Sequence, residues 1–176
     1  IILDEGVNEI GDLAFAYCKS LTSIVLPESL SEIGDSAFLS CEGLASIIIP
    51  EHVSSIGDNA FKGCKSLKNL IIPKDLDDIG EGALEDCVAL ESLSVPNVFT
   101  SSFYMSKLFT GLSPESLKTV TFTGYRDLDN SVTTALAPVE TLIINVGGDI
   151  GNLAFQSCTS LRRVVIGKDV TNIGIN

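Results

Sequence analysis

The sequence predicts an α/β repeat solenoid, in which units of about 23 residues stack along one axis, with a parallel sheet on the concave side and short helices on the convex side. Four cysteines stand 23 residues apart, and each ends a phrase of the form Ile-Gly-Asp-x-Ala-Phe-x-x-Cys, with Glu and Leu replacing Asp and Phe in the fourth copy. A unit of this length cannot bury its own apolar face, so successive units must share one core. The cysteines are Cys18, Cys41, Cys64 and Cys87.

A short strand is predicted after each cysteine, in the phrase Leu-x-x-Ile-x-Ile-Pro and its close variants. The last apolar positions of this phrase alternate, which is typical of a strand with one buried face. The proline ends the strand because it has no N–H to donate to a neighbour. Eight such strands are predicted, at residues 1–3, 24–26, 47–49, 70–72, 93–95, 120–122, 142–144 and 164–166.

A short helix is predicted within each cysteine phrase. Ile33, Ala37, Phe38, Cys41 and Leu44 stand at offsets of 0, 4, 5, 8 and 11 residues, which places them on one face of a helix. The aspartate at the start of the phrase is expected to accept the free backbone N–H groups of the first helical turn. The phenylalanines and cysteines of successive repeats are expected to form buried columns, so that all five thiols are inaccessible.

We predict one domain over residues 1–176, with regular repeats at 1–96 and 139–176 and two irregular repeats at 97–138. The strand phrases that span the irregular part begin 27, 22 and 22 residues apart, at Leu90, Leu117, Val139 and Leu161. The chain opens and closes inside a repeat, and neither end carries the polar cap that a free solenoid needs. It is therefore expected to be a fragment of a longer protein, monomeric or weakly self-associating through its uncapped ends.

Composition excludes several classes of function. The net charge of −12, from 23 acidic and 11 basic side chains, would repel a phosphate backbone, so no nucleic-acid partner is expected. Apolar runs end after three or four residues, too early for a transmembrane segment. Five cysteines without a Cys-x-x-Cys pair, together with a single histidine, predict no metal site and no cofactor.

No catalytic residues are predicted. Ser29, His52 and Asp75 stand 23 residues apart in one column, in the order of a nucleophile, a base and an orienting acid. They fall in turns after the prolines, where neither an oxyanion donor nor an enclosed pocket is expected, so the protein is not predicted to be an enzyme. Two columns of acidic residues leave calcium binding open. The alternative is helix capping for the first column and a solvated face for the second. The columns are Asp12, Asp35, Asp58 and Glu81, and Glu5, Glu28 and Glu51.

The two phrases together resemble the BspA-like leucine-rich repeat. The residues that carry the resemblance are 44–50 for the strand phrase and 53–64 for the cysteine phrase, and the match is dense over 1–96 and 139–176. The resemblance implies a right-handed solenoid of the kind found in surface proteins of oral and gut anaerobes, treponemes and some parasitic protists. It also implies an extracellular or cell-surface location and a role in adhesion or other protein contacts.

The outward positions of the predicted sheet form the first candidate binding surface. An exposed apolar stripe often marks a contact surface, although β-branched residues also favour strands that bind nothing. A neighbouring column alternates in charge from Lys68 to Arg162, and these charges are expected to pair across adjacent strands. The candidate residues are Val25, Ile48, Ile71, Ser94, Thr121, Ile143, Val165, Arg162 and Arg163.

The aromatic-rich part of the first irregular repeat forms the second candidate binding surface. Phe103, Tyr104 and Phe109 either fill the core of a wider repeat or protrude as a contact site. Insertions into solenoid repeats often map to the binding face, which keeps both interpretations open.

Two functions remain open from the sequence. The first is a non-catalytic module, secreted or on the cell surface, that holds a host matrix protein, a cell-surface protein or a glycan through the concave sheet. The second is a structural spacer that presents neighbouring domains and has no ligand of its own. An apolar stripe exposed to solvent favours the first function, and a stripe covered by polar side chains favours the second.

Overall fold

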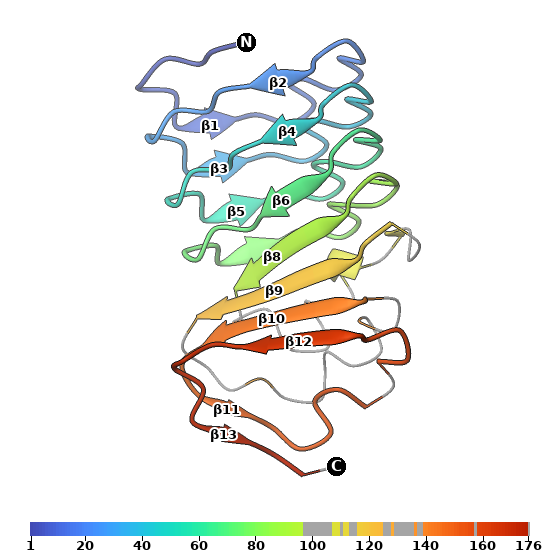
Figure 1. Cartoon of the computed structure of the whole chain (residues 1–176). Coiled ribbons are helices and arrows are strands. Elements are labelled where there is room, and N and C mark those ends of the chain that lie inside the picture. The colour runs from blue at the N-terminus through green and yellow to red at the C-terminus, as the bar shows by residue number, and fades with distance from the viewer. Residues whose placement is uncertain are drawn as a thin grey trace.

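The computed structural model describes residues 1–96, 107–109, 111–112, 116–124, 128, 136, 139–156 and 158–175. In this part the chain winds into coils that stack along one axis, with parallel strands from successive coils lying side by side (Figure 1). Strands of the regular coils pair equivalent positions of successive repeats, as in Glu9 with Glu32 and Glu32 with Ser55. The predicted repeat solenoid with a parallel sheet is therefore confirmed.

The first sheet contains the strands that follow each cysteine phrase. A two-stranded segment, β2-β4, is followed by a five-stranded segment, β6-β8-β9-β10-β12, and all of these pairs are parallel. Its strands are β2 (Ser23–Ile24), β4 (Ser46–Ile47), β6 (Asn69–Ile71), β8 (Ser92–Pro96), β9 (Thr119–Gly124), β10 (Thr141–Val146) and β12 (Arg163–Ile166). A bridge between Ile2 and Val25 adds the first coil. Seven of the eight predicted strands are thus found, although β2 and β4 begin one residue earlier and end two residues sooner than predicted. At residues 1–3, where the eighth was predicted, the structure has only the bridge at Ile2.

The irregular repeats keep the register of this sheet. Ser92 pairs with Thr119, Thr119 with Thr141, and Thr141 with Arg163. Each of these residues stands at the same place in its own strand phrase, so the pairing follows the predicted spacing of the phrases. The greater length of this repeat therefore leaves the pairing of the strands before and after it unchanged.

A second sheet, which the sequence analysis did not predict, precedes each cysteine phrase. Each strand has two residues, a polar one and an isoleucine that is followed by the glycine of the phrase. This second sheet consists of two segments, each with parallel pairing. The four-stranded segment contains β1 (Glu9–Ile10), β3 (Glu32–Ile33), β5 (Ser55–Ile56) and β7 (Asp78–Ile79), and the two-stranded segment contains β11 (Asp149–Ile150) and β13 (Asn172–Ile173). Two residues are too few for an alternating pattern, so hydropathy alone gives no signal for them.

The predicted convex helices are wrong, because the cysteine phrases form stacked turns. Phe38 donates its backbone N–H to the carbonyl of Ala60 in the next coil at 2.8 Å, whereas Leu39 donates to Ser36 in its own coil at 3.0 Å. Ser36 and Ser40 adopt φ angles of 55° and 56°, outside the helical region. A helix would direct every N–H to its own chain, but here alternate donors join neighbouring coils. In the described residues, helical geometry is confined to 107–109.

The core lies between the two sheets and the stacked turns. The rings of Phe15, Phe38 and Phe61 stack in a column, with centroids 5.3 Å apart and interplanar angles of 9° and 2°. Phe38 and Phe61 are fully buried, and Phe15, in the first coil, is half-buried. The predicted phenylalanine column is therefore confirmed.

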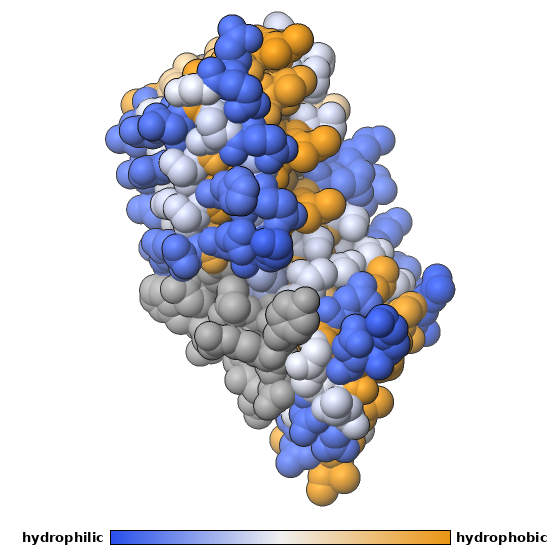
Figure 2. All heavy atoms as spheres, turned by 90° about the vertical axis from the view of Figure 1, so that its left-hand side faces the viewer, coloured by the Kyte–Doolittle hydropathy of each residue, from blue (hydrophilic) through white to orange (hydrophobic). Residues whose placement is uncertain are grey.

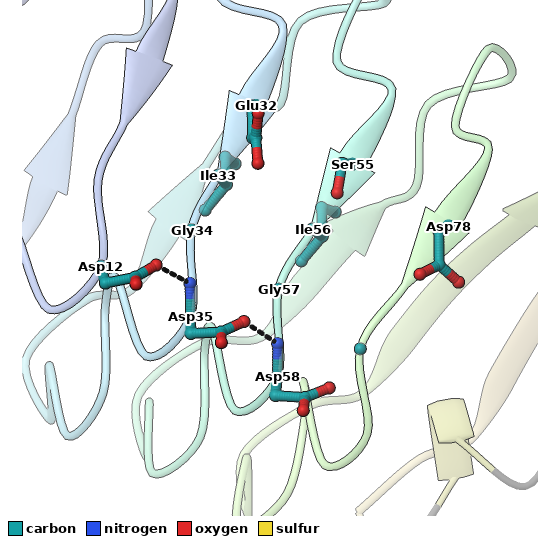
Figure 3. Close-up of a pocket in the computed structure, with 11 residues that line it drawn as sticks. Asp12, Glu32, Ile33, Gly34, Asp35, Ser55, Ile56, Gly57, Asp58 and Asp78 are labelled. Atoms are coloured by element: carbon teal, nitrogen blue, oxygen red, sulfur yellow. Dashed lines mark hydrogen bonds between the residues drawn. The ribbon is translucent and has the colours of Figure 1, made fainter.

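The Ile-Gly-Asp phrase brings adjacent coils into close contact. The backbone N–H of Asp58 donates to Oδ1 of Asp35 at 2.8 Å, and that of Asp35 donates to Oδ1 of Asp12 at 2.7 Å (Figure 3). The aspartates therefore cap the next coil, not the start of a helix as predicted. A Cβ on Gly57 would lie 2.6 Å from the backbone nitrogen of Asp35 and 2.7 Å from the carbonyl carbon of Gly34. Only glycine permits this approach.

Replacing Gly57 with alanine is expected to lower the free energy of unfolding by about 1–3 kcal/mol, because the added methyl group overlaps the backbone of the preceding coil. Gly11→Ala is the matched control, since a Cβ at that position meets nothing within 4 Å. Urea unfolding followed by circular dichroism measures both effects. Equal unfolding midpoints for the two variants would contradict the close contact.

Candidate functional site

The first sheet exposes an apolar stripe, which we define as Ile2, Val25, Ile48 and Ile71. Their exposed fractions are 75%, 56%, 85% and 67%. The stripe follows from strand geometry, because successive side chains of a strand point to opposite faces. Ile47 and Ile49, on either side of Ile48 in the chain, are each only 6% exposed. Four neighbouring coils therefore present an aliphatic side chain to solvent.

The stripe changes character beyond β6. Strand register places Ser94 beside Ile71, followed by Thr121, Ile143 and Val165 in the same column. These four side chains are half-buried, and the first two are polar. The structure thus brings the predicted column together in register, but the strongly exposed apolar part is limited to the first coils.

The charged column beside the stripe is not paired as predicted. In the described part of the chain, no ion pair within 4.0 Å joins two members of the column from Lys68 to Arg162. Their backbones are linked instead, with the N–H of Glu91 donating to the carbonyl of Lys68 at 2.8 Å. Exposed ion pairs contribute little, so solvent competes well for these side chains. Arg162 and Arg163 are also exposed, at the start of β12.

Acidic turns lie next to the stripe. Glu5, Glu28 and Glu51 each follow a stripe residue by three positions, and all three are exposed. Figure 2 shows hydrophobic side chains in a row down the upper coils, beside hydrophilic side chains that gather on the turns. The 23-residue spacing already predicts that these glutamates form one solvated column. Its position beside the apolar stripe was not predicted, because hydropathy patterns do not show how turn residues lie relative to a strand face.

The turns also account for two members of the Ser-His-Asp column. The hydroxyl of Ser29 donates to the carbonyl of Val7 at 2.9 Å, and it accepts the backbone N–H of Gly6 at 3.0 Å. The carboxylate of Asp75 pairs with Lys74 at 2.9 Å. Ser29 and Asp75 therefore serve the turns of the solenoid, without a contribution from His52.

An open acidic pocket of about 280 Å³ lies beside the second sheet (Figure 3). Its carboxylates come from β3, β7 and the aspartates of the Ile-Gly-Asp phrase. Oδ1 of Asp12, of Asp35 and of Asp58 each accepts a backbone N–H from the next coil. Among the described residues, no group of three or more His, Cys, Asp or Glu side chains is arranged to hold a metal ion. The three aspartates therefore act as structural acceptors, and the arrangement of the described carboxylates does not favour calcium.

Three of the five cysteines, Cys41, Cys64 and Cys87, are buried core residues. The thiol of Cys64 donates to the carbonyl of Phe38 at 3.3 Å, and the thiol of Cys41 makes the same contact with Phe15 at 3.0 Å. Burial raises the pKa of Cys41 to about 11 and that of Cys87 to about 12. The pKa of Cys64 rises for the same reason.

The prediction of five buried thiols is wrong for the two ends of the series. Cys18 is exposed and Cys158 is half-exposed. Cys18 lies in the first coil, where only one side is covered by a neighbouring coil (Figure 1). Burial in a solenoid comes from both neighbours, so an end coil loses part of it.

The second candidate surface is described only in part. Phe103 and Tyr104 lie outside the described residues. Phe109 is half-buried and packs against the core, directly after the fully buried Leu108. At Phe109 the contacts are those of a core residue.

In the described part of the chain, no helix has the length and apolar character that a membrane crossing requires.

The stacked coils and their two phrases define a leucine-rich repeat. The chain matches the BspA type leucine rich repeat region in six copies, over residues 1–112 and 106–176, and it belongs to this family. Two solved structures share the fold. A leucine rich cell surface protein from Faecalibacterium prausnitzii has 22% identity and a TM-score of 0.54, with 94% of this chain and 31% of that protein covered. A leucine rich repeat protein from T. pallidum has 24% identity and a TM-score of 0.57, with 99% and 72% covered.

The chain thus spans about a third of the length of the Faecalibacterium protein. At these identities the likeness is one of fold. No curated protein matches the chain significantly.

In the native protein at neutral pH, Cys18 is expected to react rapidly with a maleimide and Cys158 more slowly. Cys41, Cys64 and Cys87 should stay unmodified until denaturant is added, because they are buried and the reactive thiolate is suppressed by their raised pKa values. Peptide mapping of the labelled protein measures each site. Rapid native labelling of Cys64 would contradict the buried column.

Proposed function

We propose that the protein is a non-catalytic binding module of a surface protein, and that it holds a partner protein through the apolar stripe of the first sheet. The observation that carries the proposal is the exposure of Val25, Ile48 and Ile71 on adjacent coils, at 56%, 85% and 67%. Contiguous apolar surface of this kind usually marks a contact site.

Membership of the BspA type leucine rich repeat family supports an interaction role, since solenoids of this class offer extended surfaces for binding. The similar Faecalibacterium protein is described as a cell surface protein, which supports a cell-surface or extracellular location for this chain. A binding function is favoured over an enzymatic one, because Ser29 and Asp75 bond to turn residues and not to His52 in an arrangement that would serve nucleophilic catalysis.

The exposure of the stripe also favours binding over a spacer role. Full burial of one valine or isoleucine side chain is worth about 1.5–3 kcal/mol, so three neighbours can supply a substantial part of a contact. A spacer gains nothing from keeping these side chains in water. An aliphatic stripe suits the apolar surface of a protein better than the hydroxyl groups of a glycan, so a protein partner is preferred.

The double variant Ile48→Glu, Ile71→Glu is expected to weaken binding at least about tenfold, because it places two charges at the centre of the contact. Binding is measured on a panel of purified extracellular-matrix proteins, mucin and immobilised glycans. The matched control is Leu13→Glu, Val88→Glu, which adds the same charge at two exposed apolar positions outside the stripe.

Equal loss of binding in both variants, or none in the stripe variant, would place the site elsewhere. A well-folded protein that binds no member of the panel would favour the spacer role.

A further inference from the structure

Net charge is distributed very unevenly along the solenoid. Residues 1–89 contain 16 of the 23 acidic side chains and 5 of the 11 basic ones, a net charge of −11 out of −12. Residues 90–176 contain 7 acidic and 6 basic side chains, a net charge of −1. The exposed apolar stripe therefore lies in the half of the protein that holds almost all of the negative charge. An approaching partner meets a negative potential in this half.

The two long edges of the stripe differ in charge. One edge is the acidic flank of Glu5, Glu28 and Glu51, which ends where Lys74 pairs with Glu51 at 3.8 Å and with Asp75 at 2.9 Å. The other edge is formed by exposed but uncharged side chains two positions before the stripe residues. These are Ser23, Ser46 and Asn69. Of the two edges of this narrow apolar row, the one at the turns carries the carboxylates of Glu5, Glu28 and Glu51. Figure 2 shows these hydrophilic turns beside the row.

The spacing of the stripe distinguishes between possible occupants. Neighbouring parallel strands lie about 4.8 Å apart, so the three steps from Ile2 to Ile71 cover about 14 Å. Three turns of an α-helix rise about 16 Å, whereas three same-face steps along an extended strand cover about 20 Å. Apolar side chains that recur once per helical turn therefore match the stripe far better than those of a bound strand.

We propose that the apolar stripe binds a cationic amphipathic helix of a partner protein, aligned along the solenoid axis. The helix places its apolar ridge on Val25, Ile48 and Ile71, and a row of lysine or arginine side chains on one flank faces Glu28 and Glu51. This inference rests on the proposed function and adds the chemistry of the partner. Anionic partners, such as acidic membranes or sulfated glycans, are disfavoured on this face by the same carboxylates.

The test uses three synthetic peptides of about 14 residues, long enough for three helical turns. The first has a leucine ridge flanked by lysines, the second has glutamates in place of the lysines, and the third is the lysine peptide with a central proline that breaks the helix. Binding to the intact chain is measured by fluorescence anisotropy. The lysine peptide should bind at least about tenfold more tightly than either of the others, and salt should weaken its binding.

Two pairs of variants locate the contact. Ile48→Ser, Ile71→Ser should weaken binding of the lysine peptide about tenfold, whereas Leu13→Ser, Val88→Ser should leave it unchanged. Glu28→Gln, Glu51→Gln should weaken it and reduce its salt dependence. Glu9→Gln, Glu32→Gln removes the same charge from exposed positions on the second sheet and should have a much smaller effect. Circular dichroism checks that each variant is folded.

The outcomes separate this inference from the proposed function. Equal affinity for the lysine and glutamate peptides, or no effect of Glu28→Gln, Glu51→Gln, would overturn the cationic partner. Equal affinity for the proline peptide would overturn the helical one. If the lysine peptide does not bind but the panel of matrix proteins does so through Ile48 and Ile71, this inference fails and the proposed function stands. If neither binds, both fail.

Discussion

The close contact between coils at the Ile-Gly-Asp phrase is the constraint on which the rest of the structure depends. Glycine lets the backbone of one coil approach the aspartate of the preceding coil. The carboxylate of that aspartate then accepts the N–H of the acidic residue at the same position in the next coil, Asp35, Asp58 or Glu81, at 2.7–2.8 Å. This contact recurs at one fixed position in each regular coil, so it sets the coils in register. The same register stacks the phenylalanine rings at 5.3 Å and brings each buried thiol to the carbonyl of a preceding phenylalanine.

Register also creates the candidate site. Because equivalent residues of successive coils lie side by side, one outward position per repeat becomes a continuous row on the surface. Isoleucine or valine at that position gives the apolar stripe, and glutamate three residues later gives the acidic flank. The repeat therefore converts a short local pattern into an extended surface. This surface is an apolar row with one charged edge and one uncharged polar edge, which a suitably spaced partner can match.

The sequence predicted the strands of the first sheet, because their hydropathy alternates. It also predicted the unequal numbers of residues between these strands in the irregular repeats, because the spacing of the repeated motif determines them. It did not predict the stacked turns. The offsets of Ala37, Phe38 and Cys41 fit a helix and a turn equally well, and only the destination of the N–H groups distinguishes them. The acceptor of the Phe38 N–H is the carbonyl of Ala60, which lies in the next coil, so no pattern within one repeat predicts this bond. The glutamates of the acidic flank were predicted to form a solvated column, but their position beside the stripe was not predicted, since it depends on how a turn lies beside a strand.

The most direct test of this account is to measure scalar couplings across hydrogen bonds by NMR for the amides of Phe38 and Phe61. The account predicts couplings from these two amides to the carbonyl carbons of Ala60 and Ala83, in the next coil of the solenoid. Couplings to the carbonyls four residues earlier, Gly34 and Gly57, would show a helix in place of the stacked turns. That result would contradict coil-to-coil bonding as the basis of the fold and of the aligned surface.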